Sequence, residues 1–312
     1  MKRQSLCLFL ALFAFARCAN SSATVWIDTD VSIGSPFREV DDGFALLLAF
    51  RSPELRIAGL STTYGNASLT RSTAVARELA RQFGHAARVS AEDVYSGASS
   101  AEDLGRSTEA TAALVRRLEA GEKITYIALG PLTNLATFLR LHPQLSTRIE
   151  RIYFVGGKTA GATLGFGPSE RFRIHDANVF KDPAAVRAVI ASGIPISLAP
   201  IEVSSRFIVS GTDRERLRAC GSAGRYLADR IALWLWFWTA YVHADGGPVF
   251  DALPMIAVVS PAMVEQEKRF VTVSAAGELI ASKTGARAVQ WCGRFEKRAH
   301  EMMLRRLCGR RR

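Results

Sequence analysis

Four aspartates close to the N-terminus, arranged in two pairs, are the residues whose types and spacing most suggest chemistry. Asp28 and Asp30 follow a short apolar run at residues 25–27. Asp41 and Asp42 open the next apolar segment. A single carboxylate at a helix start caps exposed N–H groups and meets the positive end of the helix dipole. Four converging carboxylates, however, repel one another unless a cation or a proton lies between them. Because oxygen-only ligands favour a hard ion over zinc, the spacing predicts a Ca²⁺ or Mg²⁺ site.

The elements that must position these residues alternate along the chain. Short apolar runs typical of buried parallel strands lie at 25–27, 57–62, 123–129, 152–155 and 196–198. Helical patterns lie at 42–52, 70–83, 182–192 and 225–242, and Gly130-Pro131 opens another helix. This order predicts an α/β fold with a mostly parallel central sheet flanked by helices. Ligands of such sheets bind outside the carboxyl ends of the strands, where the aspartates fall.

The first residues have the pattern of a secretory signal peptide. Lys2 and Arg3 precede an apolar run over residues 6–15. Ala14 and Ala16 supply the small residues of a cleavage site. The run is shorter than the roughly 20 residues that a membrane-spanning helix needs. The pattern therefore predicts export to the periplasm or out of the cell.

The predicted signal covers residues 1–16, with cleavage somewhere within 16–23. Lipid attachment through Cys18 is the weaker alternative, because Arg17 stands where a small residue is expected. No composition break or linker divides the remainder, so we expect one domain over residues 23–312 with a short basic tail.

The formal charge of +11 is concentrated in part at the C-terminus, where five arginines lie within residues 305–312. Aromatic residues are not interleaved with them, so we expect a solvated tail and no nucleic-acid partner. Cys18, Cys220, Cys292 and Cys308 follow no metal-binding or CxxC spacing. Export would permit disulfides, but this scattered set favours mostly free or buried thiols.

Further motifs follow the two aspartate pairs in chain order. They are Thr63-Tyr64-Gly65-Asn66, Ala128-Leu129-Gly130-Pro131-Leu132-Thr133-Asn134, Val155-Gly156-Gly157, Asp176-Ala177-Asn178 before Asp182-Pro183, and Phe250-Asp251-Ala252-Leu253. With Asp28-Thr29-Asp30 and Asp41-Asp42, the set resembles the nucleoside hydrolase family over nearly the whole chain beyond the signal. Any one motif alone would be a weak match, whereas the ordered set is specific.

The resemblance implies a single domain with a Rossmann-like core and Ca²⁺-dependent hydrolysis of the N-glycosidic bond of ribonucleosides. The products would be free base and ribose, and the substrate a nucleoside or a related N-riboside. It also implies a homodimer or homotetramer.

Particular residues acquire roles only through this resemblance. Asp30, Asp42 and Asn178 would be catalytic, with Asp30 as the general base for the attacking water. Asp30, Asp42, Asp251 and the main-chain carbonyl of Leu129 would hold Ca²⁺. The ribose hydroxyls would be bound by Asp41, Asn66, Asp176, Asn178 and Asp251, with Asp28 as a support behind them.

Three departures from the family pattern stand out. The loop between the aspartate pairs is lengthened to Val31–Val40. Asp176 stands where the family more often has glutamate, and Phe250 stands where many relatives have the histidine that protonates the leaving base. Leaving-group activation must therefore differ here.

Several residues are candidates for that activation. They are His175, Tyr241 and His243 as acids, and Trp234 and Trp238 as stacking partners of the base. The two tryptophans share one face of the helix expected over 225–242, so a role in the core is the competing interpretation.

Two other functions remain open from the sequence. A nucleoside- or sugar-binding protein of the same fold that has lost turnover is compatible with Phe250. A phosphatase using Asp28 as nucleophile and Asp30 as acid/base would suit the strand that precedes them. The early Asp41-Asp42 pair favours the hydrolase over the phosphatase.

Overall fold

A computed structural model describes residues 22–285 and 287–309 of the chain, so the expected signal peptide and cleavage site lie outside the described residues. The strands are β1 (Ala23–Thr29), β2 (Leu55–Thr62), β3 (Val94–Ser96), β4 (Ile124–Ala128), β5 (Ile149–Val155), β6 (Lys158–Thr159), β7 (Leu164–Phe166), β8 (Phe172–Ile174), β9 (Ile196–Ala199), β10 (Ile208–Val209), β11 (Gly247–Pro248), β12 (Val264–Val273), β13 (Leu279–Ser282) and β14 (Arg287–Phe295).

The helices connect and cover these strands. They are α1 (Asp41–Phe50), α2 (Leu69–Phe83), α3 (Glu109–Glu119), α4 (Thr133–Leu141), α5 (Ala177–Phe180), α6 (Pro183–Ala191), α7 (Ile201–Ser204), α8 (Gly211–Arg218), α9 (Ser222–Arg230), α10 (Ala232–Trp236), α11 (Ala252–Val259) and α12 (Lys297–Leu307). None of the helices in the described part of the chain is long and apolar enough to cross a membrane.

The central sheet has ten strands in the order β3-β2-β1-β4-β5-β9-β14-β12-β13-β6. The first six strands of this order pair in parallel, as do β9 with β14 and β13 with β6, while β12 pairs antiparallel with both of its neighbours. The predicted fold is confirmed: a mostly parallel sheet in a single α/β domain. Every strand expected from the sequence is present.

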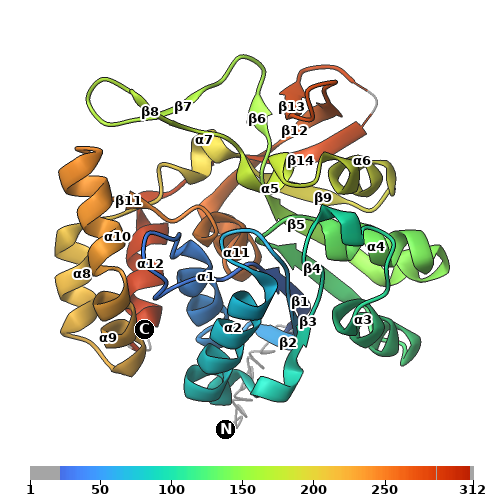
Figure 1. Cartoon of the computed structure of the whole chain (residues 1–312), viewed down its shortest axis with the longest axis horizontal. Coiled ribbons are helices and arrows are strands. Elements are labelled where there is room, and N and C mark those ends of the chain that lie inside the picture. Colours follow the sequence, from blue (N-terminus) through green and yellow to red (C-terminus); the bar gives the residue numbers. More distant parts are fainter. Residues whose placement is uncertain (1–21, 286, 310–312) are drawn as a thin grey trace, which may run out of the picture.

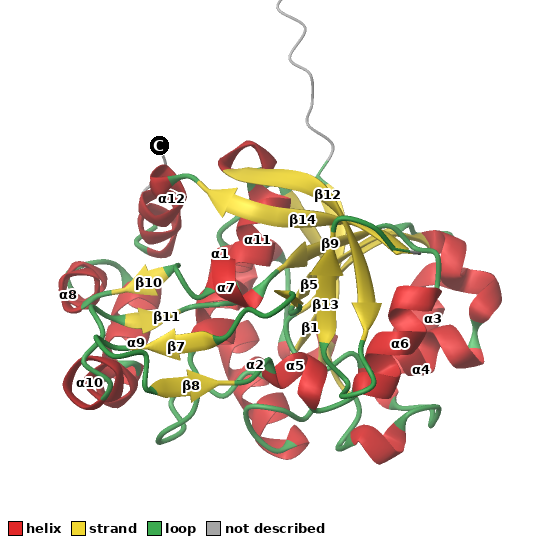
Figure 2. Ribbon diagram, turned by 90° about the horizontal axis from the view of Figure 1, so that it is seen from above, coloured by secondary structure: helices red, strands yellow, loops and turns green. Residues whose placement is uncertain are grey.

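Helices cover both faces of the sheet, which gives two apolar cores (Figures 1 and 2). One core contains α1, α2, α11 and the helices near the C-terminus, and the other contains α3, α4 and α6. Strand β1 contributes to both because its side chains alternate: Val25 and Ile27 enter the first core and Trp26 the second. A strand buried on both faces has the continuous apolar sequence seen at residues 25–27.

The helix expected over 225–242 is interrupted. It consists of α9, α10 and a π-helical turn at Phe237–Tyr241, in which the Val242 N–H donates to the Phe237 carbonyl at 3.0 Å. The Thr239 hydroxyl donates to the Leu235 carbonyl at 2.9 Å and competes with the regular backbone ladder there. Such widened turns are local devices that change which way the following side chains point.

The expectation of mostly free thiols is wrong for one pair. Cys220 and Cys308 form a disulfide, with Cα atoms 4.9 Å apart and a sequence separation of 88. Cys292 is free and buried, and Cys18 lies outside the described residues. The pairing depends on α8 packing beside α12, a contact that the spacing of the cysteines does not reveal.

Candidate active site

Three carboxylates lie close together at the N-terminal ends of α1 and α11. Asp41 and Asp42 are the first residues of α1, and Asp251 directly precedes α11, which packs against α1. Each offers an oxygen within 4.8 Å of the others, and all three side chains are buried. Burial and then the neighbouring carboxylates raise the pKa of Asp41 and of Asp251 well above the ordinary value.

These three residues, called the acid cluster below, fit a hard metal ion. Their donors are all oxygens. The Oδ1 atom of Asp41 is buried and has no hydrogen-bond partner among the described residues. A buried acceptor left unpaired is costly unless a cation or another donor reaches it.

Asp30 lies beside the cluster and is held by the loop after β2. Its carboxylate accepts hydrogen bonds from the Asn66 backbone N–H at 2.6 Å and from the Asn66 side-chain amide at 3.4 Å. The same amide donates to Asp42 at 3.2 Å. Asn66 therefore ties Asp30 to the acid cluster. Burial, followed by repulsion from Asp42, raises the pKa of Asp30 well above its ordinary value.

The close approach of this loop requires Gly65. Its φ is +156°, and a Cβ atom added there would overlap the Asp30 carboxylate. Only glycine allows the backbone N–H of Asn66 to reach Asp30 in this geometry.

Asp28 lies behind the site. Its Oδ1 accepts hydrogen bonds from the Ser61 hydroxyl at 2.6 Å and from the Asn134 amide at 2.8 Å. Burial raises its pKa to about 6, against these hydrogen bonds, which lower it. The Asn134 amide also bonds the Thr62 carbonyl at 3.1 Å, so Asp28 joins β1, β2 and α4 beneath the site, as expected for a support.

The Leu129 carbonyl follows β4 next to Asp30 and is bonded by the Asn178 amide. Asn178 Nδ2 donates to the Leu129 carbonyl at 2.8 Å and to the Val155 carbonyl at 3.2 Å. Asp176 caps α5, accepting from the backbone N–H of Val179 at 3.2 Å and from that of Gly157 at 2.6 Å. Burial raises the pKa of Asp176 to about 6, although these N–H groups act against it.

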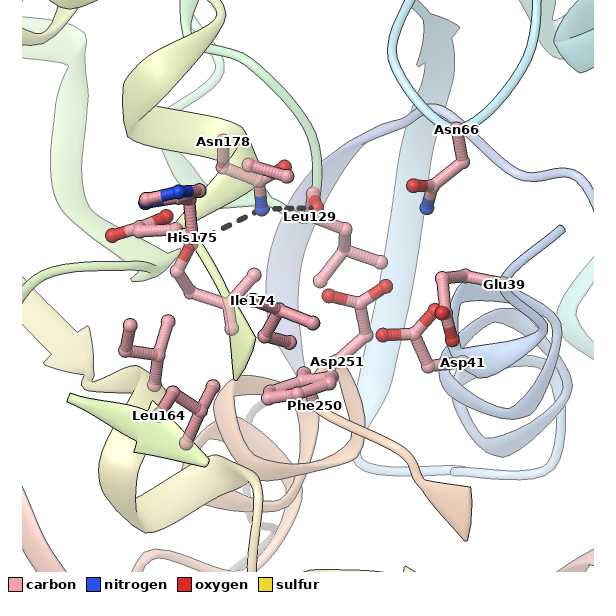
Figure 3. A pocket seen from close by; sticks show the side chains of 14 residues that line it. Glu39, Asp41, Asn66, Leu129, Leu164, Ile174, His175, Asn178, Phe250 and Asp251 are labelled. Carbon is pink, nitrogen blue, oxygen red and sulfur yellow. Dashed lines mark hydrogen bonds between the residues drawn. The ribbon is translucent and has the colours of Figure 1, made fainter. Parts of the chain in front are cut away.

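Next to these residues lies a cavity of about 230 Å³, called the sugar pocket below. It is lined by Glu39, Asp41, Asn66, Leu129, Val155, Leu164, Ile174, His175, Asp176, Ala177, Asn178, Ile201, Phe250 and Asp251. Figure 3 shows Asp41 and Asp251 side by side, Phe250 next to Asp251, and Asn178 across the pocket from Asp41, hydrogen-bonded to the Leu129 carbonyl.

The sequence profile described as "Inosine-uridine preferring nucleoside hydrolase" matches residues 25–305. The chain belongs to this nucleoside hydrolase family. The resemblance seen in the motifs is thereby confirmed, and the chain is an N-glycosyl hydrolase.

Relatives of known name agree with this membership. The pyrimidine-specific ribonucleoside hydrolase RihA of Salmonella enteritidis PT4 (strain P125109) is 28% identical over 274 residues, covering 78% of this chain and 84% of that relative. The protein of the same name from Enterobacter sp. (strain 638) is 30% identical over 274 residues, covering 78% and 83%.

Solved structures share the fold. The plant nucleoside hydrolase PpNRh1 superimposes with a TM-score of 0.77 at 23% identity, covering 92% of this chain and 99% of that one. A purine-preferring ribonucleoside hydrolase from Gardnerella vaginalis gives a TM-score of 0.75 at 21% identity, covering 92% and 98%.

The structure of this nucleoside hydrolase brings most of the predicted site residues to one place. Asp41, Asn66, Leu129, Asp176, Asn178 and Asp251 line the sugar pocket, while Asp30 and Asp42 lie directly beneath its floor. Asp42 and Asp251 belong both to the predicted metal ligands and to the acid cluster. Asp41 completes the cluster by distance, whereas Asp30 and the Leu129 carbonyl stay predicted ligands.

The predicted aglycone residues lie elsewhere. Trp238 is buried among Phe166, Phe172 and Phe237, with ring centroids 4.8–5.7 Å away. Trp234 is 5% exposed and, like Trp238 and the exposed His243, is not among the residues that line the sugar pocket. The packing favours the core interpretation of both tryptophans. Of the three candidate acids, the structure brings only His175 to the pocket wall.

One ionisable pocket residue was missed from the sequence, besides the apolar Leu164, Ile174 and Ile201. Glu39, in the lengthened loop, lines the pocket beside Asp41 (Figure 3) and accepts a hydrogen bond from the Trp234 indole at 2.9 Å. Burial raises its pKa to about 7, with the indole bond acting against this. Glu39 lies only two residues before the Asp41-Asp42 pair, and this position could have indicated a place in the site. Its location in a lengthened loop pointed the other way, because loop residues are usually solvated.

Proposed function

We propose that the protein hydrolyses the N-glycosidic bond of ribonucleosides, releasing the free base and ribose. The observation that carries the proposal is the convergence of the acid cluster, Asp30 and Asn178 around one small cavity in a chain of this family. The named relatives are ribonucleoside hydrolases, which supports the same class of substrate.

Asp30 is the proposed general base. Its carboxylate is fixed by two hydrogen bonds from Asn66, so it is oriented before substrate arrives. It would take a proton from the water that attacks the anomeric carbon. Breaking the bond to the base builds positive charge on the sugar ring, as in O-glycoside hydrolysis. The buried carboxylates around the pocket would stabilise that charge electrostatically.

Ca²⁺ is the proposed ion, held by Asp30, Asp42, Asp251 and the Leu129 carbonyl. When bound, it would supply a Lewis acid for the sugar diol and lower the pKa of a coordinated water. Asp41, Asn66 and Asn178 would hold the ribose hydroxyls by hydrogen bonds from the positions that they occupy on the pocket wall.

The leaving base faces an apolar end of the pocket. Phe250 cannot donate a proton, whereas the exposed imidazole of His175 also lines the cavity and lies against the Phe180 ring, with centroids 6.1 Å apart. We therefore propose His175 as the proton donor to the base. His175→Ala should lower turnover of nucleosides more than turnover of p-nitrophenyl riboside, whose leaving group needs no proton.

The phosphatase alternative has little support from the geometry. Asp28, its nucleophile, is fully buried, is hydrogen-bonded from Ser61 and Asn134, and does not line the sugar pocket. A phosphoryl group would have no path to it.

The proposal also covers the localisation and the oligomeric state of the protein. We propose that residues 1–16 direct export and are then removed by cleavage within 16–23, and the Cys220–Cys308 disulfide supports an oxidising compartment. We also propose a homodimer or homotetramer, which light scattering of the purified protein would test.

The decisive assay measures release of ribose from inosine, adenosine, guanosine, uridine, cytidine and p-nitrophenyl riboside, with and without a chelator. Asp30→Asn should lower kcat by at least about a hundredfold, since general-base catalysis contributes roughly 10²–10⁴. Asp229→Asn is the matched control, because Asp229 is an exposed aspartate far from the pocket walls. If no substrate turns over while nucleosides still bind, the chain is a binding protein of this fold.

A further inference from the structure

A second cavity of about 230 Å³ adjoins the sugar pocket, and it is called the outer pocket below. Its walls come from the base of the β7–β8 hairpin, from α5 and from the turn between β12 and β13. The two pockets share Leu164, Ile174, His175, Asp176 and Ile201 as lining residues. A ligand in the sugar pocket that carries a substituent on this side therefore faces the outer pocket.

The outer pocket contains a guanidinium with no carboxylate partner. Arg173 lines it, and no carboxylate lies within ion-pair distance of Arg173 in residues 22–285 and 287–309. Its Nε reaches only the Glu170 carbonyl, at 3.5 Å. Guanidinium groups pair most strongly with carboxylates and phosphates, often by two parallel hydrogen bonds.

The other cation of the outer pocket is already paired. Lys158 Nζ lies 2.6 Å from the Glu278 carboxylate. The two oxygens of Asp176 accept hydrogen bonds from the backbone N–H groups of Gly157 and Val179. Arg173 is thus the cation of this pocket that has no carboxylate partner in the described part of the chain, and the Thr163 hydroxyl is a further polar group on the wall.

The sugar orientation of the proposed function decides which substituent would enter. With the vicinal diol of the ribose at the acid cluster and the base at the apolar Phe250 end, the primary hydroxyl points to the remaining wall. That wall includes Asp176, which also lines the outer pocket. The carboxylate oxygens of Asp176 are turned to the backbone N–H groups of Gly157 and Val179.

We propose that the outer pocket is an anion subsite for a phosphate monoester on the primary hydroxyl of the ribose. The substrates would then include phosphorylated N-ribosides such as nucleoside monophosphates. Water would cleave the same C–N bond, releasing the base and ribose 5-phosphate, and the phosphate ester would stay intact. The inference rests on the proposed function for the orientation of the sugar.

The test measures binding of ribose 5-phosphate, ribose and inorganic phosphate by calorimetry to the full chain with Ca²⁺ present. Ribose 5-phosphate should bind about tenfold or more tightly than ribose, because a charge-assisted pair is added. Arg173→Ala should remove that preference and leave ribose binding unchanged. Arg171→Ala is the matched control, since Arg171 is an exposed arginine of the same hairpin that lines neither pocket.

A second variant tests the paired lysine. Glu278→Gln removes the carboxylate that holds Lys158, so ribose 5-phosphate should bind more tightly to this variant than to the parent protein. The proposal is overturned if ribose 5-phosphate binds no better than ribose. It is also overturned if Arg173→Ala leaves the preference intact, or if inorganic phosphate binds without competing with ribose 5-phosphate.

Turnover separates this inference from the proposed function. The value of kcat/KM should be higher for uridine 5′-monophosphate than for uridine. Arg173→Ala should remove this difference. If neither compound is hydrolysed but the binding preference depends on Arg173, the proposed activity fails and the subsite stands. If uridine is hydrolysed but ribose 5-phosphate binds no better than ribose, the proposed activity stands and the anion subsite fails.

Discussion

Asp30 is positioned by a glycine as much as by its hydrogen bonds. Gly65→Ala would push a methyl group into the Asp30 carboxylate and displace the Asn66 N–H that binds it. We expect kcat to fall by at least a hundredfold, because a general base moved by about 1 Å loses its alignment with the water.

Gly161→Ala is the control for this substitution. Gly161 also has a positive φ, +78°, but an added Cβ atom there meets nothing within 4 Å. It should lower the melting temperature slightly and leave kcat unchanged. Equal losses of activity in both variants would mean that backbone strain, and not the clash with Asp30, is responsible.

At this scale the sequence predicts residue types well and side-chain directions poorly. Asp41, Asn66, Asn178 and Asp251 were predicted from the motifs shared with the nucleoside hydrolase family, and the structure brings all four to the sugar pocket. The direction of the Trp238 side chain could not be predicted, because it depends on the π-helical turn at Phe237–Tyr241.

At the scale of elements, the disulfide fastens α12 to the end of α8. Cys220→Ser opens a loop whose ends are separated by 88 positions in the sequence. We expect a loss of about 2–5 kcal/mol in the free energy of unfolding, mainly because the unfolded chain becomes less constrained. Urea unfolding of the oxidised protein and the variant measures this. Cys292→Ser, at a buried free thiol, is the comparison for losing a sulfur without losing a bridge.

The same pair of helices predicts a pH dependence at the acid end. Burial opposes ionisation of Asp213, but the neighbouring His300 imidazole and hydrogen bonds from Ser210 outweigh it and lower the pKa of Asp213 to about 2. The carboxylate lies 3.3 Å from the His300 Nε2 and accepts from the Ser210 hydroxyl at 2.7 Å. Because the pKa of Asp213 is lower in the folded than in the unfolded protein, the ionised carboxylate stabilises the fold above pH 3.8. This contribution to the free energy of unfolding is lost as the pH falls towards 2.

Asp213→Asn should therefore flatten the decline of stability between pH 4 and 2, by about 1–2 kcal/mol. The measurement is the free energy of unfolding across that range for both proteins. An identical slope in the two proteins would show that Asp213 titrates normally in the folded state.

Elements built from one periodic pattern were predictable, and those that depend on distant partners were not. The parallel strands and α1, α2 and α6 follow from apolar runs and helical spacing in the sequence. The break in the helix expected over 225–242 arises from the Thr239 hydroxyl and from aromatic packing against β7 and β8. The cysteine pairing likewise depends on a contact between α8 and α12.

At the scale of the whole molecule, the acid cluster joins distant parts of the chain. Asp41 and Asp42 come from its beginning and Asp251 from α11, so the cluster exists only when the domain is folded. A cation that binds only the folded state stabilises it by about 2.7 kcal/mol at a hundred times its Kd.

Adding Ca²⁺ to protein that a chelator has freed of metal should accordingly raise the melting temperature by several degrees. Asp251→Asn should remove most of this shift, because it neutralises one carboxylate of the cluster. Calorimetric scans at fixed pH and ionic strength provide the measurement. A shift that persists in the variant would place the bound ion somewhere other than the acid cluster.

The contact between Trp234 and Glu39 has an optical consequence. The indole N–H is hydrogen-bonded to a carboxylate that lines the sugar pocket, so a ligand that moves Glu39 changes the surroundings of a fluorophore. Emission from Trp234 would then report occupancy of the pocket in the unlabelled protein. Trp234→Phe identifies its share of the signal against the other tryptophans, and binding becomes measurable in variants that no longer turn over substrate.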